Sequence, residues 1–102
     1  MMKRMAIRQA LVWVETNDGK TYYGTGYSHN DCYDQLYHMG IYARIRPYDY
    51  KSVMEGFQTT TGEFVNRERA YMIANGNNQL SSTSPDGVLQ SWMIKNYIDK
   101  ID

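Results

Sequence analysis

The apolar positions near the N-terminus predict a β-hairpin. Residues 5–16 contain an apolar, partly β-branched run with no polar face, which is typical of a central strand. The Asp-Gly pair at positions 18–19 is the strongest short signal for a hairpin turn, so we expect residues 21–26 to form the return strand. Gly24 and Gly26 in that strand predict a bulge or a close approach by another group.

The next segment predicts a short helix and then a short strand. Asn30 or Asp31 can cap a helix of about eight residues, and Gly40 is a typical left-handed stop. Over residues 41–46 apolar and polar side chains alternate, which predicts a strand that ends before Pro47.

The middle of the chain predicts a second hairpin that leads into a helix. Residues 53–59 have the pattern of a strand, residues 60–62 that of a turn, and residues 63–65 continue the chain as a strand. Asn66 is a good N-cap for a helix over residues 67–75, which ends at the glycine that follows.

The remaining residues predict a long loop and a C-terminal helix. Residues 75–87 are rich in Asn, Ser, Pro and Gly, and they form either a lid or a connector. Over residues 88–101 the apolar side chains fall on one wide helical face, which predicts a helix. A short strand over residues 88–92 is the alternative.

Together these elements predict an α+β fold. We expect a small antiparallel sheet with an N-terminal hairpin, packed against two or three short helices. The chain has 102 residues, which leaves no room for a second core, so residues 1–102 are expected to form a single domain.

Composition narrows the class of protein. Eleven basic residues balance eleven acidic ones, and zero net charge disfavours non-specific binding to duplex nucleic acid, which rests on many phosphate contacts. The single Cys32 excludes a disulfide framework within the chain. The sequence has neither an apolar run long enough for a transmembrane helix nor the pattern of a signal peptide. We therefore expect a cytoplasmic protein without a membrane partner.

Tyrosine is the most unusual feature of the composition. Ten tyrosines accompany only two phenylalanines, and tyrosine suits interfaces and ring-stacking pockets. Residues 42–51 combine tyrosines, among them Tyr48, with Arg44 and Arg46, a pairing that suits phosphate and base recognition. The alternative is an exposed strand whose arginines pair with surface carboxylates.

Residues with catalytic or metal-binding chemistry form one cluster in the sequence: His29, Asp31, Cys32 and His38. A zinc site needs three or four ligands, and no second cysteine exists. The favoured interpretation is therefore a buried cysteine at a helix start with solvent-facing histidines. No established catalytic or phosphate-loop motif is present, so we expect neither an enzyme nor a cofactor.

The predicted helix start at Asn66 is a candidate anion site. Helix N-termini present free N–H groups, and Arg67 and Arg69 would add positive charge. Phe57 precedes this helix on the predicted hairpin, which can bring its ring near the helix start. The alternative is that Phe57 belongs to the core.

Residues 56–70 carry a pattern common in small bacteriophage proteins: Gly-Phe, a turn, Gly, an apolar pair, Asn-Arg and an alanine-bearing helix. The Asn-Gln pair at 78–79, the Leu-x-Ser element at 89–91 and the segment 29–32 fit the same pattern. The chain resembles the Thoeris anti-defence sponge family of phages. That resemblance implies binding of a cyclic ADP-ribose immune signal without cleavage, in dimers and larger assemblies, with cyclic oligonucleotides as ligands of some members.

The resemblance also implies site residues. Phe57 would stack on the adenine, and Asn66 would bond the ligand. The family uses arginines from its C-terminal part, but residues 79–94 contain neither Arg nor Lys. Arg44, Arg46, Arg67 or Arg69 would have to take that role.

Three functions follow from these observations. The first is a phage-type anti-defence protein that sequesters a cyclic nucleotide or cyclic ADP-ribose signal. The second is a protein-binding inhibitor or adaptor that uses a Tyr/Arg-rich surface, and the third is a small nucleotide-hydrolysing enzyme. A wide apolar C-terminal face, including Trp92 and Ile101, predicts a homo-oligomer.

Overall fold

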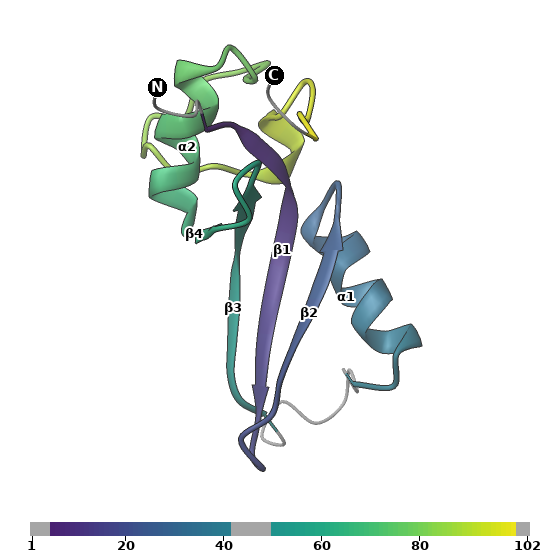
Figure 1. The fold of residues 1–102 in the computed structure, drawn as a ribbon. Coiled ribbons are helices and arrows are strands. Elements are labelled where there is room, and N and C mark those ends of the chain that lie inside the picture. The colour runs from purple at the N-terminus through teal and green to yellow at the C-terminus, as the bar shows by residue number, and fades with distance from the viewer. Residues whose placement is uncertain (1–4, 42–49, 100–102) are drawn as a thin grey trace.

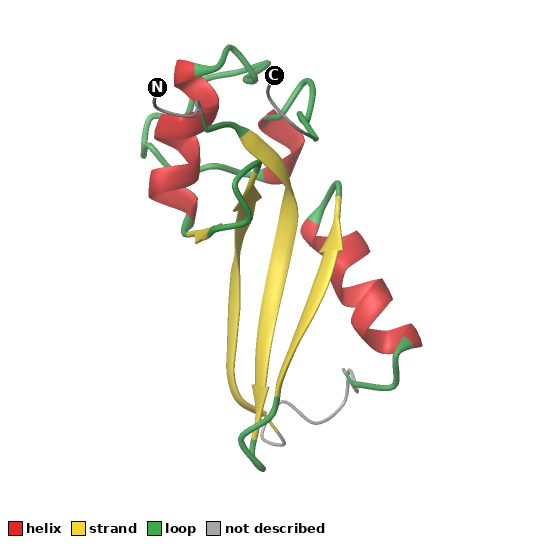
Figure 2. Cartoon of the chain, viewed as in Figure 1, coloured by secondary structure: helices red, strands yellow, loops and turns green. Residues whose placement is uncertain are grey.

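A four-stranded antiparallel sheet organises the chain in the computed structural model, which describes residues 5–41 and 50–99. The strand order is β2-β1-β3-β4 (Figure 1). Along the chain the elements are β1 (Ile7–Thr16), β2 (Thr21–Gly26), α1 (His29–His38), β3 (Tyr50–Thr59), β4 (Phe64–Val65), α2 (Arg67–Gly76) and a 3₁₀ turn, η2 (Ser91–Met93). The predicted α+β class, with an antiparallel sheet, an N-terminal hairpin and helices, is confirmed (Figure 2).

The N-terminal hairpin forms as its turn residues predict. Gly19 adopts a φ of +85°, which is costly for any residue with a side chain. The turn sets a register in which Val12 lies opposite Gly24 and Trp13 lies opposite Tyr23. Consecutive residues of β1 therefore point to opposite faces of the sheet.

Helix α1 covers one of those faces. Ala10, Val12 and Val14 of β1 are fully buried there, and the core includes Cys32 and Leu36 of α1. Gly24 permits this packing, because a Cβ atom at that position would lie 2.1 Å from the carbonyl oxygen of Cys32. The close approach predicted from the glycines of β2 is confirmed.

Local signals set the ends of both helices. Ser28 caps α1 by accepting from the amide of Asp31, so the cap lies before the predicted Asn30 or Asp31. Asn66 caps α2 as predicted, with its side chain accepting from Arg69 N. Glycine at position 40 follows α1 with a φ of +74°, which confirms the predicted stop.

The buried Gln79 fastens the start of β1 to the C-terminal segment. Its side-chain oxygen accepts from Ile7 N at 2.9 Å. Its side-chain nitrogen donates to Ile7 O at 2.8 Å and to Asn96 O at 3.2 Å. Gln79 thus binds both backbone groups of Ile7 beyond the last residue pair of β1 with β2, while β3 pairs with Ile7 through Thr59.

The predicted C-terminal helix is wrong. Of residues 88–99 only Ser91–Met93 are helical, as a single 3₁₀ turn, and the alternative strand is reduced to one bridge between Leu80 and Ile94. Tertiary hydrogen bonds replace the helical ones, because Ser81 donates to Met93 O and Gln79 donates to Asn96 O. Leu89 and Met93 are buried, whereas Trp92 is exposed, so the wide apolar face does not form.

One predicted strand and one predicted absence remain to be compared with the structure. The strand predicted over residues 41–46 falls almost wholly outside the described residues. Among the helices of the described ranges, none has the length and apolar character needed to cross a membrane.

Gly24 provides a test of the α1–sheet packing. We expect Gly24→Ala to lower the free energy of unfolding by about 1–3 kcal/mol, because the added methyl group has no space against Cys32. Gly76→Ala is the matched control. It lies in α2 with open space around its Cβ position, so the same change should stabilise the fold by about 0.4–1 kcal/mol. Urea unfolding measures both variants, and equal effects would contradict the packing.

Candidate functional site

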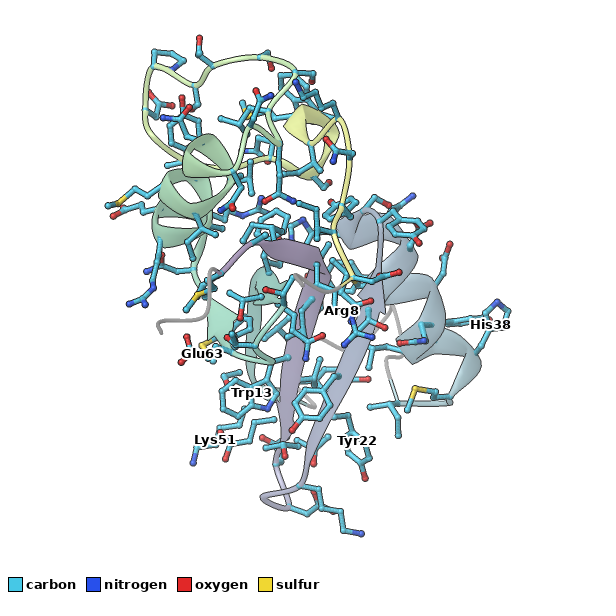
Figure 3. The ribbon with its side chains drawn as sticks, turned by 45° about the horizontal axis from the view of Figure 1, so that its top comes forward. Arg8, Trp13, Tyr22, His38, Lys51 and Glu63 are labelled. Atoms are coloured by element: carbon cyan, nitrogen blue, oxygen red, sulfur yellow. The ribbon has the colours of Figure 1, made fainter. Side chains whose placement is uncertain are left out.

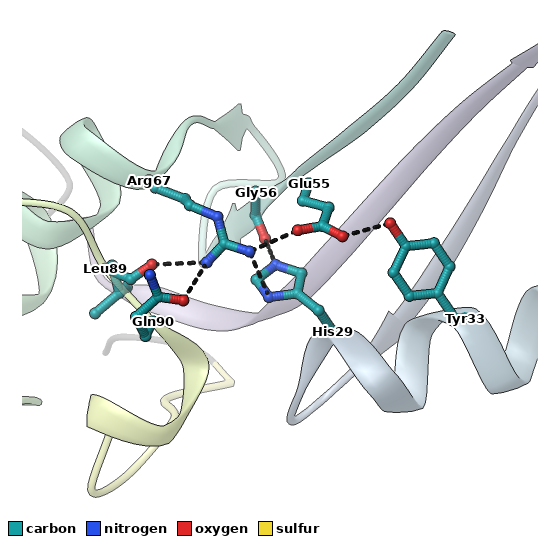
Figure 4. Close-up of polar contacts among 7 residues, drawn as sticks. All are labelled: His29, Tyr33, Glu55, Gly56, Arg67, Leu89 and Gln90. Atoms are coloured by element: carbon teal, nitrogen blue, oxygen red, sulfur yellow. Dashed lines mark hydrogen bonds and ion pairs between the residues drawn. The ribbon is translucent and has the colours of Figure 1, made fainter.

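A polar network lies where α1, β3 and α2 meet, and Figure 4 shows its members. His29, in the first turn of α1, is buried, and its Nε2 lies 2.8 Å from the carbonyl oxygen of Gly56. Because a carbonyl only accepts, Nε2 carries the ring proton. The other ring nitrogen, Nδ1, then accepts from Arg67 Nη2 at 3.2 Å. This pattern requires a neutral imidazole.

Arg67 is the centre of the network. Its Nη2 donates to Glu55 Oε1 at 2.7 Å. Its Nη1 donates to Leu89 O at 2.9 Å and to Gln90 Oε1 at 3.2 Å. Glu55 also accepts a hydrogen bond from the Tyr33 hydroxyl. The guanidinium thus joins α1, β3 and the C-terminal segment to α2.

The charges of the network follow from its hydrogen bonds. Burial lowers the pKa of His29, the positive charge of Arg67 lowers it further, and the bond to Gly56 only partly opposes them. Burial disfavours the charged form of Glu55, but hydrogen bonds from Tyr33 and Arg67 outweigh it and hold the pKa of that carboxyl below its ordinary value. The network therefore contains one neutral ring and one ion pair.

The structure places three sequence-predicted ligand residues in structural roles. Phe57 is fully buried, and its ring meets that of His29 edge-on with centroids 5.0 Å apart. Phe57 therefore belongs to the core, as the alternative prediction had it, and no face of its ring is open to a base. The side-chain oxygen of Asn66 is occupied as a helix cap. The guanidinium N–H groups of Arg67 donate hydrogen bonds within the polar network.

The other predicted ligand residues are placed differently. Arg69 is exposed on α2 and borders a shallow hollow of about 550 Å³ with Glu68 and Met72. The three remaining candidates lie outside the described residues: Arg44, Arg46 and Tyr48. Their role toward a ligand stays a prediction.

The Cys-His cluster does not assemble. Cys32 is buried, and burial raises the pKa of its thiol to about 12, as befits a core cysteine. His38 is exposed as expected, but His29 is buried, so the prediction of a solvent-facing ring is wrong there because Gly56 and Arg67 satisfy both ring nitrogens. Within residues 5–41 and 50–99, no group of three or more His, Cys, Asp or Glu side chains is placed to hold a metal ion.

A second feature, which the sequence did not indicate, is a hollow on the sheet face opposite α1. It has a volume of about 390 Å³, and all four strands contribute to its wall. We call it the aromatic hollow, and its lining residues are Leu11, Trp13, Tyr23, Thr25, Gln58, Gly62 and Phe64. Trp13 and Phe64 contact each other edge-on, with ring centroids 6.1 Å apart, and Tyr23 is 58% exposed.

One residue that lines the aromatic hollow, Trp13, carries an unpartnered hydrogen-bond donor. The indole nitrogen of Trp13 (Figure 3) is buried and has no hydrogen-bond partner among the described residues. A buried donor without a partner costs about 1–3 kcal/mol of stability. Gln58 also lines the hollow, and its side-chain oxygen accepts from Gln9.

Comparison with known protein families identifies a match. The family model described as phage T4 y16D protein matches residues 6–94. That range contains the polar network and the aromatic hollow. No curated protein and no solved structure matches the chain.

The neutral state of His29 generates a pH prediction. Because folding lowers the pKa of this ring below 6.5, the stability it contributes is complete above that pH. It is lost as the pH falls from 6.5 toward the folded-state pKa. Urea unfolding between about pH 5 and 8 should show this decline in the wild type.

The histidines provide their own control. We expect His29→Gln to flatten the slope of unfolding free energy against pH, and His38→Gln, at an exposed position, to leave it unchanged. An unchanged slope in His29→Gln would show that this ring is not held neutral by the network.

Proposed function

We propose that this chain, which belongs to the phage T4 y16D protein family, is a phage anti-defence protein that sequesters a nucleotide in the host cytoplasm. In this proposal the ligand is a cyclic nucleotide or cyclic ADP-ribose signal, bound through its base and not cleaved. The family match supports the phage origin only and provides no link to the Thoeris sponge family. The choice of ligand is argued from the aromatic hollow.

The observation that carries the proposal is the chemistry of the aromatic hollow. Ligand sites have volumes of roughly 300–1,000 Å³ and mostly apolar walls with a few polar groups. This hollow falls in that range, with three aromatic rings and the buried indole N–H of Trp13. A purine or pyrimidine offers a flat face for the rings and edge acceptors for an N–H donor. Each base stacked on an aromatic ring contributes about 1–3 kcal/mol.

Sequestration requires affinity and no reaction, and this agrees with the character of the hollow. Among the described residues, no carboxylate, histidine or cysteine lines the hollow. The sequence predicts that Arg44, Arg46 and Tyr48 contact the ligand's phosphates, and all three lie outside the described residues. In this proposal the hollow selects the base and the arginines add charge recognition.

A protein-binding inhibitor or adaptor is the alternative that a specific observation favours. Tyr27, Met72 and Trp92 are strongly exposed outside the aromatic hollow, and such side chains are enriched at protein interfaces. Incubation with nucleotides followed by heating separates the functions. A sequestering protein releases the ligand intact, a hydrolase releases product, and an adaptor never retains the ligand.

Tyr23 tests the location of the site. It is largely exposed, so Tyr23→Ala should leave the melting temperature almost unchanged. We expect the same variant to weaken nucleotide binding by about 5- to 150-fold, which corresponds to the loss of one stacking contact. Titration calorimetry with cyclic ADP-ribose and cyclic dinucleotides measures the affinity.

The matched control is Tyr27→Ala, at a tyrosine that is 68% exposed and lies outside the hollow. Its affinity should equal that of the wild type. A Trp92→Phe background leaves Trp13 as the only tryptophan, so that its emission reports directly on the hollow. Equal losses in both tyrosine variants, or a Trp13 signal that ignores a bound nucleotide, would place the site elsewhere.

A further inference from the structure

Strand β3 has an open edge. On one side it pairs with β1 along most of its length, whereas β4 covers the other side only at Phe57 and Gln58. Figure 1 shows the lower part of β3 running along the border of the sheet without a neighbour beyond it in the described chain. An unpaired edge is a ready template for another strand.

The hydrogen-bonding direction of this edge can be deduced from Thr59. Its N–H donates to the carbonyl oxygen of Glu63 at 2.9 Å, on the β4 side, and is therefore turned away from β1. Because backbone groups alternate in direction along an antiparallel strand, the N–H and C=O groups of Val53 and Glu55 also face outward. No strand of the described chain pairs with them on that side.

The side chains of this edge are apolar at the centre and charged at both ends. Val53 is 39% exposed and Met54 is 42% exposed. Lys51 precedes them and Glu55 follows them. Protected edges carry charges or proline at their centre, whereas this one offers two apolar side chains to a partner.

We propose that a second copy of this chain pairs with the open edge, β3 against β3, in an antiparallel arrangement centred on Val53. In this register the outward-facing Val53 forms a hydrogen-bonded pair with Val53 of the partner subunit, as its direction requires. Lys51 then lies across from Glu55 of the partner subunit. Opposite charges in such cross-strand positions are stabilising.

The neighbourhood of Glu55 suits an incoming ammonium group. A hollow of about 320 Å³ lies beside it, lined also by Asn66, Arg67, Glu68 and Val88. Arg67 is already bonded to Glu55, but Glu68 has no ion pair among the described residues. Lys51 (Figure 3) lies at an irregularity of the β1–β3 pairing, and its side chain is 67% exposed. Its one described ion pair is to Glu15, at 3.6 Å. Its flexible stem is free to reach this hollow in a partner.

The dimer would contain one continuous eight-stranded sheet. A two-fold axis perpendicular to the sheet keeps equivalent faces on the same side, so both aromatic hollows would open on one surface. Met54 lies beside Trp13 in the β1–β3 register, so the pairing also extends the apolar surface next to each hollow. The inference rests on β3 alone and holds whatever ligand the hollow binds.

Charge reversal tests the register. Sedimentation velocity at about 100 µM, where weak interfaces associate, should give twice the 11.9 kDa chain mass for the wild type. We expect Lys51→Glu to raise the dimer dissociation constant by about tenfold or more, since like charges would face each other. Lys20→Glu, at the β1–β2 hairpin turn, changes the net charge equally and should leave the dimer intact. A monomeric wild type, or a Lys51→Glu variant that dimerises normally, would overturn the proposal.

A cross-link tests the centre of the interface. In the proposed register Val53 faces Val53 of the partner subunit as a hydrogen-bonded pair, with Cα atoms about 5.5 Å apart, within the range that a disulfide spans. Oxidised glutathione should therefore convert Val53→Cys into a covalent dimer. Met72→Cys, exposed on α2, should not form a covalent dimer, and the buried Cys32 should not react. Failure of Val53→Cys to cross-link, or equal cross-linking of both variants, would contradict the pairing.

Discussion

The guanidinium of Arg67 is the contact on which the arrangement of the described elements depends. Its donors bind His29 at the start of α1, Glu55 in the middle of β3, and Leu89 and Gln90 in the C-terminal segment. These partners belong to three different segments of the chain, none of which is adjacent to Arg67 in the sequence. Since the side chain is only partly exposed, each bond is charge-assisted in a poorly solvated place. Two of the residues that the sequence predicts as ligands, Asn66 and Arg67, are therefore occupied by structural contacts.

Much of the fold was predictable because its signals are local. The Asp-Gly turn, the glycine after α1 and the Asn66 cap each act within a few residues, and each lies where the pattern predicted. The segment after residue 87 was not predictable in the same way. Its apolar spacing suits a helix, but Gln79 and Ser81 bind its carbonyls, and Leu89 is drawn into the core. Tertiary hydrogen bonds outweighed a helical pattern that has no strong cap.

The candidate site was hidden from the sequence for a related reason. The apolar run of β1 showed that both faces of that strand are apolar, but not that one face would stay partly uncovered. The aromatic hollow collects Trp13, Tyr23 and Phe64 from three strands, and only the register of the sheet brings them together. Phe57, which the resemblance favoured for stacking, differs from Phe64 in facing the core. The proposed role in base recognition thus passes from Phe57 to Phe64, which lies on the other face of the sheet.

Binding of a base in the aromatic hollow is tested most directly by the indole N–H resonance of Trp13 in a ¹H–¹⁵N NMR spectrum. This donor is unpartnered in the free chain, so a bound nucleotide that supplies an acceptor should shift its proton resonance downfield. The amide resonances of Thr25 and Gln58 should move with it, while the exposed Trp92 indole stays fixed. A nucleotide that binds while Trp13 is unperturbed, with shifts centred on Asn66 and Arg69 instead, would contradict the proposed site.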